Sequence, residues 1–151
     1  MKNYKNNYLR IGLVAGTKGI GQAHIREFLN FGLEKVGLYG KTFNRNRVKK
    51  IKFEKKKSQK IYNLKNYNEI RKFKPRVVSI CTPTELHSKH IYTFSKISKN
   101  LLVEKPLTWK DNLDNYLIAK KIFKLKNNLI VNLPMINLAS QIYSREKIKK
   151  I

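Results

Sequence analysis

Short apolar runs alternate with longer amphipathic segments along most of this chain. The apolar runs predict strands at residues 10–14, 35–39, 61–62, 76–81, 101–103 and 129–133. Between them, apolar side chains at helical spacing predict helices at residues 20–31, 46–56, 67–73, 86–98 and 112–125. The runs RVVSIC and LIV resemble parallel strands that are buried on both faces. This alternation predicts right-handed strand–helix–strand units and an α/β fold with a doubly wound parallel sheet.

Length and composition limit what this chain can be. A chain of 151 residues makes about one domain and can bury a core without disulfides or metals. We expect that domain over residues 1–135, followed by a short tail over residues 136–151. The single cysteine, Cys81, excludes an intrachain disulfide. The N-terminus lacks an apolar signal segment and no later apolar run is long enough to cross a membrane, so we expect a cytoplasmic protein with no membrane partner.

The formal net charge of +25 indicates an affinity for anions. Nucleic acids are one class of partner that such a charge suits. The lysines, however, are spread along the chain, and only residues 49–60 (KKIKFEKKKSQK) form a dense run. That run lacks the repeated pattern of aromatic residues on which single-strand binders stack bases. We therefore interpret the run as a solvated surface, disfavour a nucleic-acid partner, and expect the charge to attract smaller anions such as phosphorylated cofactors.

A cluster of glycines, in the sequence AGTKGIG, follows the first predicted strand. A glycine turn between a strand and a helix presents unpaired amides at the positive end of the helix, which suit a pyrophosphate. Gly16 and Gly21 match the first and third glycines of the pattern G-x-G-x-x-G, whereas Lys18 stands at the second. The predicted cofactor-binding residues of this turn are Gly16, Thr17, Lys18, Gly19, Ile20 and Gly21.

Lys18 leaves three interpretations of this turn open. Its side chain either crowds the pyrophosphate and weakens binding, or turns outward so that its ammonium helps to neutralise phosphate. In the second case, Gly19 supplies the backbone freedom that the missing glycine would have given. The third interpretation is an ordinary tight turn that binds no ligand.

The end of the second predicted strand bears on the choice of cofactor. Asp or Glu normally stands there and binds the adenosine ribose hydroxyls of NAD. Here Gly40 or Lys41 occupies that place, and Thr42, Arg45 and Arg47 follow. A basic cluster suits a 2′-phosphate, so Lys41, Thr42 and Arg45 are predicted cofactor-binding residues and NADP is favoured over NAD. The same residues are also compatible with a basic loop that holds no ligand.

Two later stretches, VVSICTPTELHSKH (77–90) and NLLVEKPLTW (100–109), add a family resemblance. Together with IGLVAGTKGIGQAH, they resemble the N-terminal half of the Gfo/Idh/MocA oxidoreductases. Members show the motifs I-G-x-x-H, T-P-x-x-x-H and E-K-P in this order, each after a strand. The chain has Ile20-Gly21 with His24, Thr82-Pro83 with His87, and Glu104-Lys105-Pro106. The resemblance covers roughly residues 10–135 and implies a Rossmann-like domain that binds NAD or NADP.

The resemblance also implies roles for single residues. Thr82 and Pro83 would lie against the ribose and nicotinamide side of the cofactor, and His87 would either cap that turn or touch the cofactor. Glu104 would lie beside the nicotinamide. Lys105 would be the catalytic residue, which hydrogen-bonds the substrate hydroxyl, because a cation helps to hold a developing alkoxide. The structural alternative is that Lys105 belongs to a tight turn without chemistry of its own, in which the bond to the following proline can be cis.

The remaining chemistry-bearing side chains are interpreted as structural. His24 and His90 lie in predicted helices and are expected to pack there. Cys81 ends a buried strand and is expected to be an inert, small apolar residue. No spacing of His, Cys, Asp or Glu predicts a metal site.

Beyond residue 135 the chain departs from the family. Relatives continue into a C-terminal domain that walls the pocket for a sugar, sugar-nucleotide or cyclitol substrate, and we expect that domain to be absent here. In the segment VNLPMIN, Asn132 and Asn137 stand where relatives often carry His, Tyr or Arg. One hypothesis is the cofactor half of an oxidoreductase, completed by another chain or by a homo-oligomer. The others are a non-catalytic nucleotide-binding or partner protein and a basic nucleic-acid-associated protein.

Overall fold

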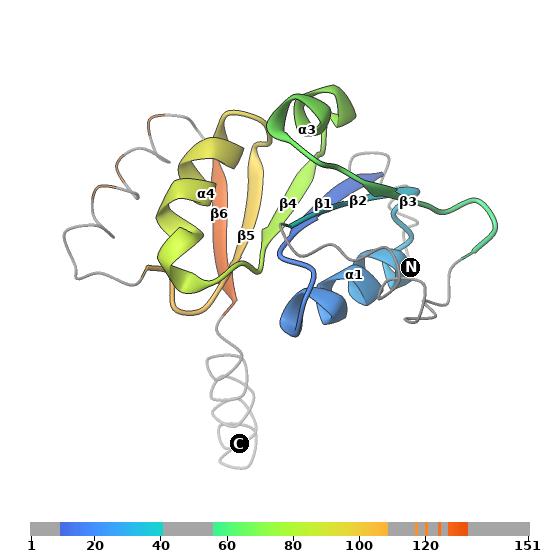
Figure 1. Cartoon of the computed structure of the whole chain (residues 1–151), viewed down its shortest axis with the longest axis horizontal. Helices are drawn as coiled ribbons and strands as arrows, with labels where there is room; N and C mark the ends of the chain where they lie inside the picture. Colours follow the sequence, from blue (N-terminus) through green and yellow to red (C-terminus); the bar gives the residue numbers. More distant parts are fainter. Residues whose placement is uncertain are drawn as a thin grey trace, which may run out of the picture.

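The computed structural model describes residues 10–40, 56–108 and 127–132, together with helical positions 117, 120 and 124. In this part of the chain, six strands form one parallel sheet in the order β3-β2-β1-β4-β5-β6 (Figure 1). This order confirms the predicted doubly wound, Rossmann-like α/β fold. The strands are β1 (Ile11–Ala15), β2 (Lys35–Tyr39), β3 (Lys60–Asn63), β4 (Val77–Ile80), β5 (Asn100–Glu104) and β6 (Asn128–Asn132).

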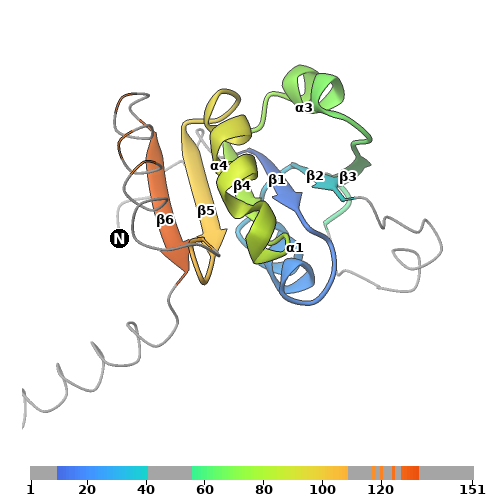
Figure 2. The ribbon, with the colours of Figure 1, turned by 60° about the vertical axis from the view of Figure 1, so that its left-hand side comes forward.

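Helices cover both faces of the sheet. The helix α1 (Ile20–Asn30) joins β1 to β2 and lies on one face, whereas α3 (Tyr67–Phe73) and α4 (His87–Ser95) lie on the other (Figures 1 and 2). A short 3-10 helix, η1 (Thr84–Leu86), precedes α4. No helix within the described residues is both long and apolar enough to cross a membrane.

Several boundaries differ from the predicted ones. The strand predicted at 76–81 is shorter, and the helix predicted at 86–98 begins at His87 and ends at Ser95. The reason for the later start is that Pro83 has extended backbone angles (φ −51°, ψ 144°) and the chain then makes one 3-10 turn. The helix predicted at 46–56 lies outside the described residues except for its last position, and that predicted at 112–125 is described only at its three helical positions.

The hydrophobic core has two parts, one on each face. On one face Ile70 of α3 and Phe94 of α4 are fully buried against the sheet. On the other face Ile25 and Phe28 of α1 pack against β1 and β2. Burial of each such side chain stabilises the fold by about 1.5–3 kcal/mol. Because α1 is held along its length, its first turn is fixed at the end of β1.

All strands run in one direction, so their carboxyl ends meet at one edge of the sheet, the lower edge in Figure 2. The chain passes from β1 to β2 on one side, and β4 flanks β1 on the other. Open α/β sheets bind ligands outside the carboxyl ends at such a reversal of strand order. The three motifs of the sequence follow β1, β4 and β5 at this edge.

Candidate functional site

The glycine turn after β1 is packed against the end of β4. Gly16 has φ +92°, and a Cβ on it would lie 2.3 Å from the carbonyl oxygen of Cys81. The Gly16 amide donates to the Tyr39 carbonyl at 2.8 Å, and the Cys81 amide donates to the Ala15 carbonyl at 2.7 Å. The ends of β1, β2 and β4 are therefore joined backbone to backbone, which leaves no room for a side chain at Gly16.

The first turn of α1 lies directly over Gly16. A Cβ on Gly21 would lie 1.8 Å from the Gly16 carbonyl oxygen, far inside any contact distance. Gly19, in contrast, would have a Cβ with no atom within 4 Å, and its φ is +52°. The turn therefore has no room for a side chain where α1 packs against Gly16, whereas the space beside Gly19 is free of atoms from the described residues.

Several amides at the start of α1 are available to a ligand. The Gly21 amide donates to Lys18 and the Gln22 amide to Gly19. In the part of the chain that is described, the amides of residues 17–20 donate to no backbone oxygen, and no side chain caps the helix. Free amides at the positive end of a helix attract an anion. The open space beside Gly19 and these amides fit the diphosphate of a dinucleotide.

Two side chains of this turn face solvent. Lys18 is exposed, and Ile20 is 50% exposed although it is apolar. Thr17 is half-buried, and a Cβ on Gly40 would lie 3.6 Å from its Oγ1, so the end of β2 adjoins the turn. The predicted NADP residues come next in the chain but lie outside the described residues, so their role stays a prediction: Lys41, Thr42 and Arg45.

The segment after β4, Thr82 and Pro83, is held by two histidines of α4. His90 Nδ1 lies 3.0 Å from Thr82 Oγ1, and His87 Nε2 lies 2.8 Å from the Thr82 carbonyl oxygen. The other ring nitrogen of His87 lies 2.9 Å from the carbonyl oxygen of Pro106. Because carbonyl oxygens only accept hydrogen bonds, a His87 N–H is the donor in each bond, and a ring with one proton donates to one of the two carbonyls at a time.

His90 belongs to an aromatic cluster beside this segment. Burial, followed by the charges of Lys89 and His87, lowers the pKa of His90 to about 4. Its ring is therefore neutral at pH 7, and it packs edge-on against Tyr39 and tilted against Phe94. This arrangement agrees with the interpretation of His90 as a packing residue, with the added hydrogen bond to Thr82.

The E-K-P segment, Glu104 to Pro106, begins at the last residue of β5. Lys105 is exposed, and its ammonium forms no ion pair or hydrogen bond with any described residue. The peptide bond between Lys105 and Pro106 is cis. Glu104, in contrast, points inward and is only 8% exposed. The segment therefore presents a cation at the edge of the sheet and buries a carboxylate beneath it.

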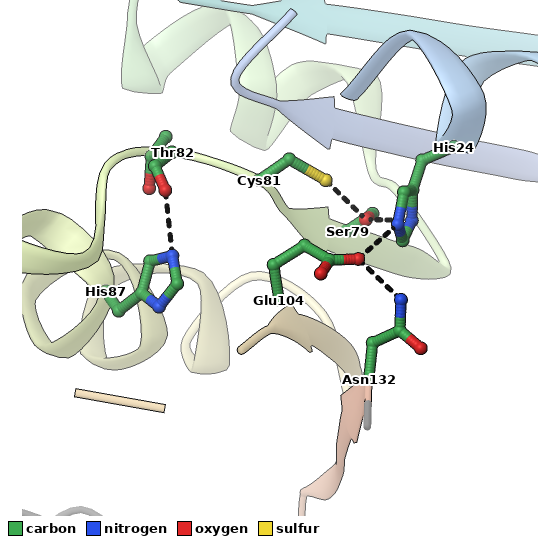
Figure 3. A network of polar contacts seen from close by, with 7 residues as sticks. All are labelled: His24, Ser79, Cys81, Thr82, His87, Glu104 and Asn132. Atoms are coloured by element: carbon green, nitrogen blue, oxygen red, sulfur yellow. Dashed lines mark hydrogen bonds and ion pairs between the residues drawn. The ribbon is translucent and has the colours of Figure 1, made fainter. Parts of the chain in front are cut away.

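The buried Glu104 carboxylate is the centre of a polar network (Figure 3). Its Oε1 lies 2.6 Å from His24 Nε2 of α1 and 2.6 Å from Asn132 Nδ2 of β6. His24 Nδ1 lies 2.8 Å from Ser79 Oγ of β4, and Ser79 Oγ lies 3.3 Å from Cys81 Sγ. The network therefore links the first helix to three strands at the carboxyl edge.

More than one set of proton positions satisfies this chain of contacts. With a proton on Nε2 alone, His24 donates to Glu104 and accepts from the Ser79 hydroxyl, and the Cys81 thiol donates to Ser79. With a proton on each ring nitrogen, His24 donates to both Glu104 and Ser79, and the Ser79 hydroxyl donates to Cys81. In each case His24 and Asn132 donate to the same Glu104 oxygen, and hydrogen bonds in such a chain strengthen one another.

Sequence reasoning missed this network. His24 was expected to pack in its helix, and Ser79 and Asn132 were given no role. The available signal was the position of single polar residues in apolar strands, as in VVSIC and NLIVN. Buried polar groups need partners, so these positions indicate a polar network without saying which residues pair.

The Cys81 thiol is a poor nucleophile at this site. Burial raises the pKa of Cys81 to about 11, the Glu104 charge adds to this, and the hydrogen bond with Ser79 opposes it. Only the thiolate reacts, so the shift agrees with the interpretation of Cys81 as inert.

We expect Cys81 to react with DTNB at pH 8 at least about a hundredfold more slowly in the native protein than in the unfolded chain. The reason is that a thiol with a pKa of about 11 is almost fully protonated at pH 8, whereas an ordinary thiol is partly ionised. Stopped-flow absorbance with and without denaturant measures both rates on the same chain. Equal rates would contradict the burial and protonation assigned to this side chain.

Comparisons with known proteins identify the family. A family model described as an oxidoreductase family with an NAD-binding Rossmann fold (GFO_IDH_MocA) matches residues 9–133. No curated protein matches the chain significantly.

Several solved structures share the fold at low sequence identity. The myo-inositol 2-dehydrogenase from Lactobacillus plantarum has a TM-score of 0.69 at 18% identity, over 93% of this chain and 41% of that one. The UDP-N-acetylglucosamine 3-dehydrogenase GnnA from Acidithiobacillus ferrooxidans has a TM-score of 0.60 at 16% identity, and the match covers 80% of this chain and 37% of that one. GenD2 from gentamicin A biosynthesis, in complex with NAD, has a TM-score of 0.60 at 18% identity, and the match covers 81% of this chain and 34% of that one.

At these identities the structures show the fold alone, and this chain spans only 34–41% of their length. The family model, in contrast, covers most of the 151 residues. Its span runs from the start of β1 to the end of β6 and includes all three motifs. The chain therefore belongs to the Gfo/Idh/MocA oxidoreductase family and comprises its NAD-binding Rossmann domain.

Proposed function

We propose that this chain binds a nicotinamide dinucleotide along the carboxyl edge of its sheet and serves as the cofactor half of an oxidoreductase. The observation that carries the proposal is the start of α1. There Gly16 and Gly21 allow backbone contact, Gly19 lies beside open space, and the amides of residues 17–20 have no backbone acceptor among the residues that the structure describes. The bound nicotinamide would supply hydride transfer, to or from the hydroxyl carbon of a sugar, sugar nucleotide or cyclitol.

The proposed cofactor extends along the edge from β2 to β5. The diphosphate binds at the glycine turn, and the adenosine side lies toward the end of β2, where Gly40 adjoins Thr17. The nicotinamide side lies toward Thr82 and Pro83 and the E-K-P segment. The preference for NADP rests on the basic residues after Gly40. The proposed preference for NADP can be tested against NAD, the cofactor that is bound in the GenD2 structure.

Lys105 is the proposed catalytic residue. Its ammonium is exposed at the carboxyl edge, where it can donate a hydrogen bond to a substrate hydroxyl and hold the oxygen as charge develops. A hydride-transfer site must also position the substrate and exclude water. Because the chain spans 34–41% of the length of the similar structures, we propose that turnover needs the rest of the site from a further polypeptide segment or chain.

We expect NADPH or NADH to stabilise the chain by about 2.7 kcal/mol when the ligand is present at about 100 times its dissociation constant. Both cofactors have a diphosphate for the helix start, and only NADPH has the 2′-phosphate that the basic residues would hold. Thermal unfolding across a ligand titration gives the affinity for each. The absence of any shift with both cofactors would overturn the proposal.

Lys18→Gly separates the two ligand-binding interpretations of the turn. It restores glycine where the fingerprint expects it, at an exposed position. Tighter cofactor binding in this variant means that the lysine crowds the diphosphate, whereas weaker binding means that the ammonium assists it. A Lys65→Gly variant also removes an exposed lysine, from the loop before α3, and controls for loss of charge alone.

A further inference from the structure

The polar residues of the three sequence motifs contact one another, and these contacts converge on the E-K-P segment. His24 comes from I-G-x-x-H, His87 from T-P-x-x-x-H and Glu104 from E-K-P. His24 bonds Glu104, and His87 bonds the carbonyl of Pro106. Each of the three residues is less than 10% exposed. His87 and Glu104, which were predicted to lie at the cofactor, are thus largely internal.

One end of the E-K-P segment is held through its carboxylate. Glu104 Oε1 accepts from His24 on the side of α1 and from Asn132 on the side of β6 (Figure 3). Both distances are 2.6 Å, which is in the range of charge-assisted hydrogen bonds. The side chain of Glu104 therefore cannot rotate without breaking two contacts to different elements.

The other end of the segment is held through its backbone. His87 Nδ1 lies 2.9 Å from the Pro106 carbonyl oxygen, and Nε2 lies 2.8 Å from the Thr82 carbonyl oxygen. The His87 side chain is 1% exposed, so these bonds are shielded from water. The same ring thereby ties the segment after β4 to the segment after β5.

Lys105 lies between these two points of attachment, and its ammonium has no ion pair or hydrogen bond among the described residues. We infer that His87 and Asn132, together with His24, are positioning residues that hold the backbone of Lys105 in place at the nicotinamide end of the site. The inference rests on the proposed function for the identity of the ligand. The placement of the Lys105 backbone can be tested without any ligand.

The first variant is His87→Leu, which removes the ring contacts with the Pro106 and Thr82 carbonyl oxygens. The second is His87→Gln, whose side-chain amide can restore one of these contacts. ¹⁵N relaxation on the full chain gives order parameters for the Lys105 and Leu107 amides. We expect about 0.85 in the wild type, below about 0.6 in His87→Leu, and an intermediate value in His87→Gln. Asn132→Ala is a milder second variant, because Asn132 is half-buried on an edge strand, and it should also lower the Lys105 value.

Gln59→Leu is the matched control. Gln59 is 3% exposed and also donates to two backbone carbonyls, those of Leu29 and Leu33, at the opposite end of α1. This variant should lose comparable stability and leave the Lys105 order parameter unchanged. Unchanged values in both His87→Leu and Asn132→Ala, or an equal fall in Gln59→Leu, would overturn the inference. If His87→Leu does not fold, Asn132→Ala alone decides.

A ligand measurement tests the connection with the nicotinamide. ADP-ribose keeps the diphosphate of NADH but lacks the nicotinamide. We expect His87→Leu to weaken NADH binding about tenfold and leave ADP-ribose binding unchanged, with partial recovery in His87→Gln. Equal weakening of both ligands would contradict a role at the nicotinamide end. If the wild type binds neither ligand, the proposed function fails, and the order parameters still decide whether His87 and Asn132 position Lys105.

Discussion

Replacing Gly21 by alanine is expected to lower the free energy of unfolding by about 3 kcal/mol and to abolish measurable dinucleotide binding. The added Cβ would lie 1.8 Å from the Gly16 carbonyl oxygen. Gly16 cannot yield, because it is bonded to Tyr39 and has the Cys81 carbonyl against it. Relief therefore requires α1 to move away from the turn, which displaces the amides proposed to bind the diphosphate.

Urea unfolding and NADH titration on the same preparation measure both effects. Gly32→Ala is the control, since Gly32 also belongs to α1's surroundings but lies past the other end of the helix. It has φ +84° and open space around a Cβ, so alanine there costs only about 1–2 kcal/mol of backbone strain. Its cofactor affinity should equal that of the wild type. A Gly21→Ala protein with native stability and normal binding would refute the packing described for the turn.

The fold could be predicted because its signals are local. Each apolar run predicts a strand by itself, and the alternation with helical segments predicts the parallel arrangement. The errors lie at boundaries that depend on tertiary contacts. The strand at 60–63 is longer than its apolar pair Ile61 and Tyr62, since pairing with β2 extends it to the polar ends.

The sequence predicted where on the sheet the site residues lie, but not which residues contact one another. The glycines, the lysine and the acid at the carboxyl edge could be placed because each lies at the end of a strand or directly after one. The partners of Glu104 could not, because His24 lies 80 residues earlier in the chain and Asn132 lies 28 residues later. No local pattern encodes such pairs. The resemblance implies that Glu104 lies beside the nicotinamide, which stays a prediction, and it did not indicate that the carboxylate is buried and bonded to His24 and Asn132.

His24→Leu is expected to lower the free energy of unfolding by about 3–5 kcal/mol at neutral pH, because it removes one hydrogen-bond partner of the buried Glu104 carboxylate. Among the described residues, Glu104 would keep only Asn132 as a donor, and the hydroxyl of Ser79 would lose its hydrogen bond with His24. Glu104→Met, a change of similar volume, should cost less. This variant removes the carboxylate itself, so no buried charge is left without a partner. Its two former donors, the His24 ring and the Asn132 amide, lose their acceptor, but Asn132 is half-buried and its amide can reach water.

The double variant His24→Leu with Glu104→Met shows whether the two side chains depend on each other. It leaves no buried carboxylate, so its cost should fall short of the sum of the single costs by at least about 2 kcal/mol. Urea midpoints at unchanged m-values measure each corner of the cycle. Costs that add within about 0.5 kcal/mol would mean that the carboxylate does not rely on His24. The expected coupling instead means that the first helix and the end of β5 are held in register by one hydrogen-bonded charge. Such a charge can be exchanged for apolar packing only if both partners change together.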